Sequence, residues 1–269
     1  MFPKPELSCT CKPTKATMAT STFGTKVLVV TGHLDALDTE IIDLENSKFA
    51  CSKVGKFPKI LFKANGGLVG KTPMVCGGWS SGTFKKSCYN LEENGVWKED
   101  EKAKLVRGRQ NYISGSVVIK DQLFIPESIK KSGPTSSWYL NFEMVEPGKK
   151  QKALQPINKW GLFHKLSDKN SCIVKWDNNT IMLIGMGASK KETFFINMGN
   201  KTVTPGPKLL KGRQSHGCSE MTVNGEEFVV VTGGKGQVAD KISYIKSTEI
   251  LPKSSFGKGW QAGKKLNIT

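Results

Sequence analysis

The chain has 269 residues, enough for one large domain or two small ones, and its 38% hydrophobic content argues against global disorder. No apolar run approaches the ~20 residues of a membrane-spanning helix, and the first residues lack the apolar core of a signal peptide, so the compartment, cytoplasmic or secreted, stays open. The formal net charge of +17 is almost entirely lysine, with arginine only at Arg107, Arg109 and Arg213, which argues against sequence-specific nucleic-acid binding because base-reading sites favour the planar fork of arginine.

Residues 1–25 are rich in proline, lysine and threonine and predict an N-terminal arm with at most one edge strand near 18–23. Two apolar runs follow, at 27–31 and 39–44, and the first of them ends at Gly32-His33. Runs of this length that end in turn residues are typical of β-strands. We therefore expect a first sheet over about 27–54.

The clearest structural unit lies in the next segment, which we place at 60–100. The apolar run Met74-Val75-Cys76 ends at the pair Gly77–Gly78, and a polar loop, a strand with Tyr89, a turn and Trp97 follow. Glycine at the end of a strand permits positive φ and close backbone approach. Tyr89 and Trp97 are large enough to fill the space between neighbouring sheets.

Weaker copies of this unit recur along the rest of the chain. The copy at 112–148 has Ile125-Pro126-Glu127 where the glycine pair is expected, and the copy at 171–205 contains the strand TIMLIG. The copy at 215–264 contains the strand FVVVT, ends it at Gly233–Gly234 and closes at Trp260. The glycine ends recur at roughly 50 residues, a period that indicates a repeat protein.

The order of strand, glycine pair, loop, tyrosine, turn and tryptophan resembles the kelch repeat, one blade of a β-propeller. The chain is most similar to divergent kelch proteins of the galactose-oxidase-like propeller kind. The resemblance implies an all-β kelch-type β-propeller over 26–269 with five four-stranded blades or six, and it leaves open whether a last blade is missing from this chain. The residues that carry the repeat are Gly77, Gly78, Tyr89, Trp97, Arg109, Arg213, Gly233, Gly234 and Trp260.

A second echo supports this register. The segment 105–110 (LVRGRQ) resembles 210–214 (LKGRQ), and each precedes the first strand of a copy. In kelch repeats an arginine commonly occupies this entry to the innermost strand. The resemblance implies that Arg109 and Arg213 are buried or half-buried and satisfy loop carbonyls; the alternative is a rim that binds an anion.

The chain has seven cysteines and no CxxC pair, which argues against a zinc ribbon. In an oxidising compartment Cys76 and Cys88 are the best pair, because they lie on adjacent antiparallel strands of one hairpin. Cys172 and Cys218 come second, at similar places in two neighbouring repeats. Glycosylation sequons occur at Asn178, Asn200 and Asn267, close to the number expected by chance, so by themselves they say little.

No motif points to a cofactor or a metal. Residues 65–72 end like a phosphate-binding loop but lead into a strand instead of a helix, and 234–239 fits a loose dinucleotide fingerprint at the glycine end of a repeat. The histidines His33, His164 and His216 lack the spacing of a metal site, and His216 is expected to be structural. Galactose oxidase holds copper with two tyrosines and two histidines, a set that this chain does not match. We expect no cofactor and no catalytic residue.

The expected function is that of a non-enzymatic scaffold that presents loops at the ends of the blades to a protein partner. The excess of lysine is typical of a solvated surface, and the alternative is a secreted propeller that binds an acidic glycan or another polyanion. The sequence also leaves open a self-assembling protein bridged by the odd cysteine, and a carbohydrate-active enzyme, for which Glu220 is the main carboxylate on an inner strand.

Four loops are expected to form the contact surface, at 79–86, 127–135, 188–191 and 235–243. They are expected to do so because they connect strand to strand at the ends of the blades and have unusual content. The candidate binding residues in or beside them are Trp79, Lys85, Lys86, Lys130, Lys131, Lys190, Lys191 and Lys235.

Overall fold

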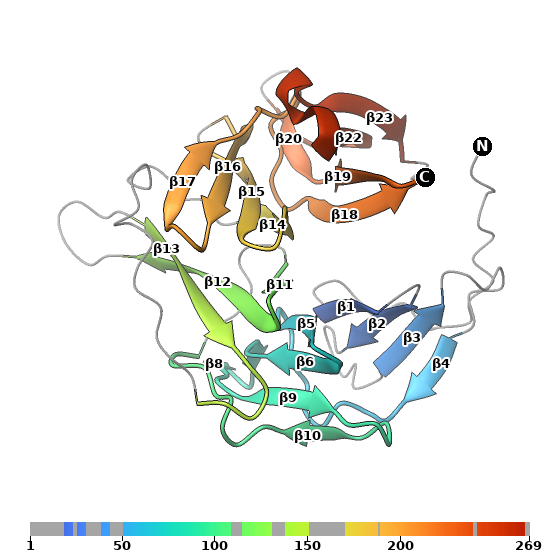
Figure 1. Cartoon of the computed structure of the whole chain (residues 1–269), viewed down its shortest axis with the longest axis vertical. Coiled ribbons are helices and arrows are strands. Elements are labelled where there is room, and N and C mark those ends of the chain that lie inside the picture. The colour runs from blue at the N-terminus through green and yellow to red at the C-terminus, as the bar shows by residue number, and fades with distance from the viewer. Residues whose placement is uncertain are drawn as a thin grey trace. The chain divides into compact units, whose positions relative to one another are not determined.

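The computed structural model describes residues 19–23, 26–30, 39–43, 51–108, 115–130, 138–150, 170–187, 189–238 and 241–266. These residues form antiparallel sheets that are wound strand after strand along the chain (Figure 1). The expected arm before residue 19 lies outside the described residues, as do Arg109 and Lys131. Among the described residues no helix is long and apolar enough to cross a bilayer.

The first sheet begins earlier than the repeat pattern indicated. Its strand order is β1-β2-β3-β4, with the bounds β1 Ala19–Phe23, β2 Lys26–Val30, β3 Thr39–Asp43 and β4 Cys51–Val54. Strand β1 pairs with β2 over its whole length, from Ala19 opposite Val30 to Phe23 opposite Lys26. The residues before 26 therefore supply a full strand at the edge of this sheet.

The second sheet contains the clearest copy of the repeat. Its order is β10-β9-β6-β5, with β5 Asn65–Val69, β6 Thr72–Cys76, β9 Cys88–Leu91 and β10 Trp97–Glu99. A small hairpin of β7 (Trp79–Ser80) and β8 (Thr83–Phe84) lies between β6 and β9 in the chain. A three-stranded sheet follows, made of β11 Val117–Ile119, β12 Gln122–Lys130 and β13 Trp138–Val145.

The last two sheets are again four-stranded. One comprises β14 Cys172–Lys175, β15 Thr180–Met186, β16 Glu192–Asn197 and β17 Thr202–Pro205. The other comprises β18 Gly217–Val223, β19 Glu226–Thr232, β22 Ser247–Pro252 and β23 Gln261–Lys265. A second inserted hairpin, β20 Lys235–Val238 and β21 Lys241–Tyr244, lies between β19 and β22 in the chain, and the 3-10 helix η3 (Lys253–Lys258) lies between β22 and β23.

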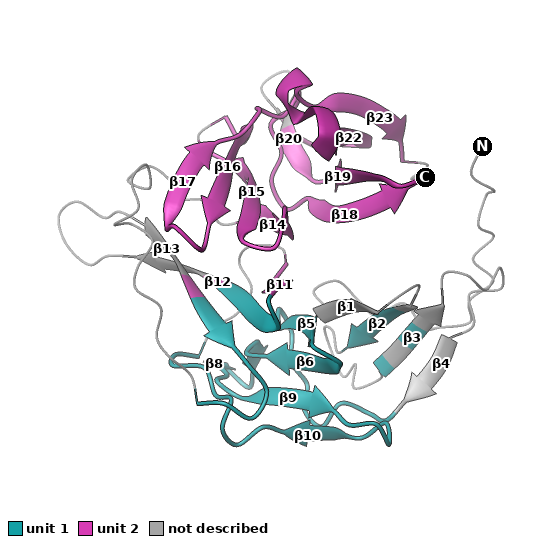
Figure 2. Cartoon of the chain, in the orientation of Figure 1, with its two compact units in different colours: residues 1–111, 120–125, 143–153 teal, residues 112–119, 126–142, 154–269 magenta. Residues whose placement is uncertain are grey.

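The chain divides into two compact units, residues 1–111, 120–125 and 143–153 and residues 112–119, 126–142 and 154–269 (Figure 2). In unit 1 the edge strand β1 contacts β5, and in unit 2 β14 contacts β18, so within each unit the first strands of successive sheets are neighbours. Strand β15 is buried at every position. A strand apolar on both faces is what a sheet covered on both sides requires.

Each unit has an aromatic core that uses the large residues of the repeat. In unit 1 the ring of Phe57 makes edge contacts with Tyr89 and Trp97, at centroid distances of 4.9 and 5.0 Å. The indole Nε1 of Trp97 donates to Thr39 Oγ1 at 2.9 Å. In unit 2 the indole Nε1 of Trp260 donates to the carbonyl of Pro207 at 2.9 Å. These bonds satisfy the polar edge of each buried indole, which would otherwise be costly to desolvate.

Candidate binding site

The four loops expected to form the contact surface occupy one position in the sheet topology. They lie in the connections β6 to β9, β12 to β13, β15 to β16 and β19 to β22. Each of these connections joins the second strand of a sheet to its third strand. Because the strands of a meander alternate in direction, each loop leaves its own sheet at the equivalent end. Residues 131–137 of the second loop lie outside the described residues.

The glycine pairs at the start of two of these loops have the same backbone conformation. Gly77 and Gly78 have φ of 70° and 92°, and Gly233 and Gly234 have φ of 62° and 91°. A Cβ on Gly234 would lie 2.8 Å from the carbonyl oxygen of Gln214, closer than packing allows. Glycine is therefore needed both for the positive φ and for the space.

Each glycine pair leads into a short backbone bridge that fixes the inserted hairpin. Trp79 N donates to Phe62 O at 2.9 Å, and Phe62 N donates back to Trp79 O at 3.1 Å. Lys235 and Gln214 exchange the same two bonds, both at 2.8 Å. The hairpin after the second strand is thus fastened to the segment that enters the same sheet.

The LVRGRQ and LKGRQ segments dock onto the loop of the preceding sheet. The amide of Leu105 donates to Lys86 O at 2.8 Å, and the amide of Leu209, the residue directly before LKGRQ, donates to Lys191 O at 2.9 Å. A Cβ on Gly212 would collide with the carbonyl oxygen of Ser189. The close approach needs a residue without a side chain, which explains the glycine in this echo.

Arg213 and Glu249 form a buried clasp beneath the loops of unit 2. The guanidinium of Arg213 is fully buried and donates to the carbonyls of Gly233 and Ser247, at 2.8 and 3.0 Å, and to Glu249 Oε1 at 2.7 Å. Its surroundings are loop carbonyls and a carboxylate, and no described contact places it on an exposed rim.

Glu249 extends the clasp to the entering segment. Its two carboxylate oxygens accept hydrogen bonds from the backbone amides of Leu210 (2.7 Å) and Lys211 (3.1 Å). Since a buried carboxylate is stable only when it is paired and hydrogen-bonded, these contacts hold the acid and the loop in one arrangement. We call Arg213 and Glu249 the Arg213–Glu249 clasp.

Unit 1 contains a buried glutamate that corresponds to Glu249 of the clasp. Glu143 in β13 is 2% exposed, and one of its carboxylate oxygens accepts a hydrogen bond from the amide of Val106. Val106 and Leu210 occupy matching places in the two echoes. Sequence reasoning missed both glutamates, although each is followed two residues later by a buried apolar residue, Val145 or Leu251.

The loops of unit 2 surround a pocket of about 560 Å³, which we call the lysine pocket. The residues that line it are Lys191, Leu210, Lys211, Gly212, Tyr244, Ile245, Lys246, Ser247 and Lys265. No carboxylate is among these described residues. The Arg213–Glu249 clasp lies directly beneath the lysine pocket, because Glu249 accepts hydrogen bonds from the amides of two lining residues, Leu210 and Lys211.

Hairpin β20–β21 presents apolar side chains at the edge of the lysine pocket. Ile242 and Tyr244 are 73% and 76% exposed, and Lys235 Nζ lies 5.1 Å from the centroid of the Tyr244 ring. Of the candidate binding residues, Lys191 therefore lines the pocket and Lys235 contacts a lining residue. The backbone amide of Arg213 donates to Lys190 O at 3.1 Å, so Lys190 lies beside them.

The other candidate binding residues belong to unit 1 or have no described side chain. The Trp79 ring stacks at a tilt on Phe62 with a centroid distance of 4.4 Å. Lys85 Nζ donates to Thr83 Oγ1 at 2.7 Å, while Lys86 supplies a backbone carbonyl to Leu105. Lys130 ends strand β12, and its side chain, like the whole of Lys131, lies outside the described residues.

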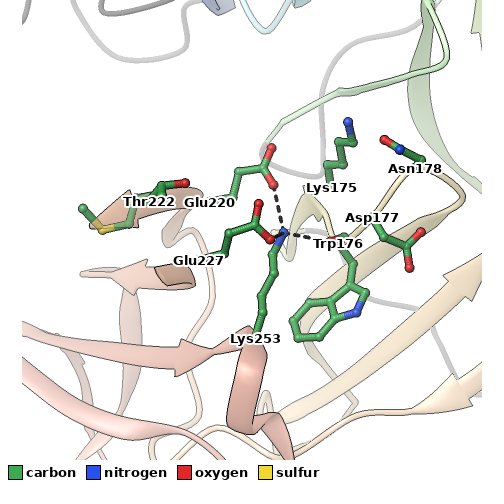
Figure 3. Close-up of a pocket in the computed structure, with 9 residues that line it drawn as sticks. Lys175, Trp176, Asp177, Asn178, Glu220, Thr222, Glu227 and Lys253 are labelled. Carbon is green, nitrogen blue, oxygen red and sulfur yellow. Dashed lines mark hydrogen bonds and ion pairs between the residues drawn. The ribbon is translucent and has the colours of Figure 1, made fainter. Parts of the chain in front are cut away.

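A second pocket of about 490 Å³, the Trp176 pocket, lies at the β14–β15 and β18–β19 turns of unit 2 (Figure 3). Lys253 is at its centre: its Nζ forms ion pairs with Glu220 and Glu227, both at 3.3 Å, and donates to the carbonyl of Trp176 at 2.7 Å. The same Nζ lies 5.6 Å from the Trp176 ring. Glu220, the main carboxylate expected for a carbohydrate-active enzyme, therefore forms an ion pair with Lys253.

His216 is buried between Gly185 and Gly234, the glycines near the ends of the strands β15 and β19 of two sheets. It is 1% exposed, and a Cβ on Gly185 or Gly234 would collide with it. Burial, and after it the positive charge of Arg213, lowers the pKa of the imidazole to about 4. The ring is thus neutral near pH 7. Among the described residues no group of three His, Cys, Asp or Glu side chains could hold a metal ion.

Two disulfides brace the sheets. Cys76 and Cys88 are directly opposite each other on β6 and β9, with their Cα atoms 4.1 Å apart. Cys172 and Cys218 join β14 to β18, the first strands of successive sheets in unit 2, with a Cα separation of 6.1 Å. Cys76–Cys88 therefore links two strands within one sheet, and Cys172–Cys218 links two sheets.

No protein-family model matches the chain, and no curated protein matches it. Solved structures do match: 208 chains resemble it in fold. One is the structure of YjhT, with a TM-score of 0.70 over 93% of this chain and 84% of that chain, at 10% sequence identity. A likeness at this identity concerns the fold alone. The chain is similar in architecture to YjhT and is an all-β protein with a propeller-like arrangement of sheets.

Proposed function

We propose that this chain is a non-enzymatic binding protein of the kelch type, in which the three-stranded sheet β11–β13 counts as a fifth blade. The loops between second and third strands present its contact surface to a protein partner. The observation that carries the proposal is the exposed pair Ile242 and Tyr244 on a hairpin beside a lysine-lined pocket. Exposed apolar side chains that are gathered at one site, with charged groups around them, are typical of an interaction surface.

The chemistry of the lysine pocket favours an acidic peptide segment that also carries an apolar side chain. Lys191, Lys211 and Lys265 contribute positive charge, and Leu210 and Ile245 contribute apolar surface. Carboxylates of the partner would meet the lysine ammonium groups, while an aromatic or aliphatic side chain would be buried against Tyr244. Charge complementarity supplies the association rate and the apolar anchor supplies most of the affinity.

The Arg213–Glu249 clasp supports the proposal by fixing the base of this surface. Its hydrogen bonds reach Gly233 and Ser247 on one side and the amides of Leu210 and Lys211 on the other. A contact surface that is already ordered loses less entropy when a partner binds. The buried hydrogen bonds of the clasp should therefore reduce the entropy that the loops lose when a partner binds.

Fluorescence anisotropy with defined peptides tests the proposal. The probe is a dye-labelled peptide of glutamates and aspartates with one central phenylalanine, and the matched peptides replace the phenylalanine by alanine or the acids by serine. We expect binding of the first peptide and weaker binding of both others. A sulfated heparin oligosaccharide added as competitor addresses the alternative ligand: binding of heparin with no binding of any peptide contradicts the protein-partner proposal and supports a polyanion.

Charge-reversal variants locate the binding surface. The double variant Lys211→Glu, Lys265→Glu should weaken peptide binding by about tenfold or more, since two surface charge contacts are each replaced by repulsion. The control Lys201→Glu, Lys258→Glu changes net charge by the same amount on exposed residues outside the lysine pocket. Equal losses in the two double variants would mean that binding follows net charge and not this site.

A further inference from the structure

Two of the three glycosylation sequons lie at the tips of exposed turns in unit 2. Asn178 is in the turn between β14 and β15, and Asn200 is in the turn between β16 and β17; both side chains are exposed. The third sequon, at Asn267, lies outside the described residues. Asparagine is itself common in turns, so the exposure of both side chains, and not the motif alone, is the observation that matters.

The local bonding at both sites leaves the amide nitrogen available. At Asn200 the side-chain Oδ1 accepts hydrogen bonds from the amide (3.2 Å) and the hydroxyl (2.7 Å) of Thr202, the third residue of its own sequon. Within the described residues the side chain of Asn178 makes no hydrogen bond. A sugar attached to Nδ2 would therefore break none of these bonds.

The two disulfides give an independent indication of the compartment. Cys76–Cys88 and Cys172–Cys218 are both formed in the structure, one within a sheet and one between sheets. Disulfides of this structural kind form and persist in oxidising environments such as the secretory pathway and the cell exterior. That is also the compartment in which asparagine sequons are modified.

We infer that Asn178 and Asn200 carry N-linked glycans, in a protein that folds in an oxidising secretory compartment. In the transfer, Nδ2 of the asparagine forms a bond to the anomeric carbon of an oligosaccharide carried on a lipid diphosphate. The bond from that carbon to the diphosphate breaks, the lipid diphosphate leaves with the electron pair, and the amide proton passes to a base of the transferase. No oxidant or reductant is needed.

The two glycans would stand at one end of the sheet β14–β17. The turns that carry them are adjacent, since Met198 N donates to Asn179 O at 2.7 Å. Asn178 also borders the Trp176 pocket, as Figure 3 shows. The β15–β16 turn with Lys191 is at the opposite end of the same sheet. Glycans would therefore cover the Trp176 pocket and leave the lysine pocket open.

Mass spectrometry of the native protein tests the inference. The protein is isolated from its source, unfolded in denaturant and alkylated without reduction, and then treated with peptide-N-glycosidase in heavy-oxygen water. We expect labelled aspartate at positions 178 and 200 and no alkylation of the four bridged cysteines. Unmodified asparagine at either position overturns the assignment of that residue, and alkylated cysteines at these bridges overturn the assigned compartment.

Matched variants made in secreting eukaryotic cells separate glycan loss from misfolding. Asn178→Gln and Asn200→Gln should each remove one glycan, seen as a step in gel mobility. Asn179→Gln and Lys201→Gln change the middle residue of each sequon and should leave both glycans in place. Because peptide binding to the lysine pocket is measured separately, failure of this inference leaves the proposed function untouched, and the reverse also holds.

Discussion

The Arg213–Glu249 clasp is the residue pair on which the binding loops of unit 2 depend. Glu249→Gln removes the charge that compensates the fully buried guanidinium, and Arg213→Met leaves the carboxylate unpaired. Breaking one partner of a buried pair costs about 3–5 kcal/mol, so each variant should lower the free energy of unfolding by that amount in urea denaturation.

The exposed substitution Glu227→Gln is the control for the clasp. Glu227 has a side-chain exposure of 62% and pairs with Lys253 at the surface, so its loss should change stability by less than about 1 kcal/mol. A loss below about 1 kcal/mol for Glu249→Gln would show that the clasp is not buried as described.

Gly212 offers a test of the close approach between successive sheets. A methyl group at this position would collide with the carbonyl oxygen of Ser189, a backbone atom that cannot move alone. Gly212→Ala should therefore destabilise the protein by about 1–3 kcal/mol in thermal or urea unfolding. The matched variant Gly257→Ala meets no atom within 4 Å and should be neutral; similar values for both would refute the contact.

His216 predicts how stability changes between pH 4 and 6.5. Its folded-state pKa is about 4, below the unfolded value of 6.5, so in this range the unfolded chain binds a proton that the folded chain does not. Stability should therefore fall as the pH falls through this window, by at most about 3 kcal/mol from this group. Urea unfolding at pH 7 and pH 5 measures the difference.

The variant His216→Leu isolates this contribution, because it removes the titrating group from both states. Asp100 acts lower in pH than His216: burial raises the pKa of its carboxyl group, but hydrogen bonds from the amides of Gly148, Ala103 and Lys102 and from Asn90 outweigh this effect and lower the pKa. Stability from Asp100 is therefore lost only as the pH falls below its unfolded pKa. If the stability of His216→Leu fell between pH 7 and pH 5 as much as that of the unaltered protein, the fall could not come from the imidazole of His216.

The sequence could indicate some of these residues and not others. Arg213 stood out because its segment recurs, and the resemblance to kelch repeats implied loop carbonyls as its partners. Glu249 did not, since a lone glutamate in a strand is usually solvated. Only the alternation Glu249-x-Leu251, matched by Glu143-x-Val145, carried a signal that the glutamate is on the buried face.

At the scale of elements, the two disulfides should differ in how much they stabilise the fold. The bridge Cys76–Cys88 spans 12 residues of sequence and Cys172–Cys218 spans 46. A cross-link that closes a longer loop removes more entropy from the unfolded chain, which gives about 3 and about 4 kcal/mol. The double serine variant at Cys172 and Cys218 should therefore have the lower unfolding midpoint. The reverse order would show that the sheet-to-sheet bridge does not constrain the unfolded chain as proposed.

The strands of the sheets were easier to predict than the hairpins inserted between them. Runs such as TIMLIG and FVVVT are long enough to show their pattern, and β15 and β19 lie where these runs do. Strands β7 and β8 have two residues each, too few to show alternation, so the sequence indicated only a loop. The contact surface was expected at these connections, but its shape depends on the hairpins.

At the scale of the whole molecule, the repeat period indicated a propeller-like arrangement, which likeness to solved structures at 10% identity supports. The lysine pocket could not be predicted, because its lining comes from four separated segments around residues 191, 211, 245 and 265. Only the fold brings them together. The repeat is visible in the sequence because each copy is a local pattern. A pocket lined by several copies depends on how the copies pack, which the sequence does not show directly.

Hydrogen–deuterium exchange of the intact protein, with and without the acidic phenylalanine peptide, tests whether the lysine pocket is the contact surface. Peptide binding should slow amide exchange in 209–212 and 242–247, the segments around the lysine pocket, and should leave exchange in 176–179 and 220–227, around the Trp176 pocket, unchanged. Protection at the Trp176 pocket instead, or no protection at a peptide concentration that saturates the anisotropy signal, would contradict this assignment.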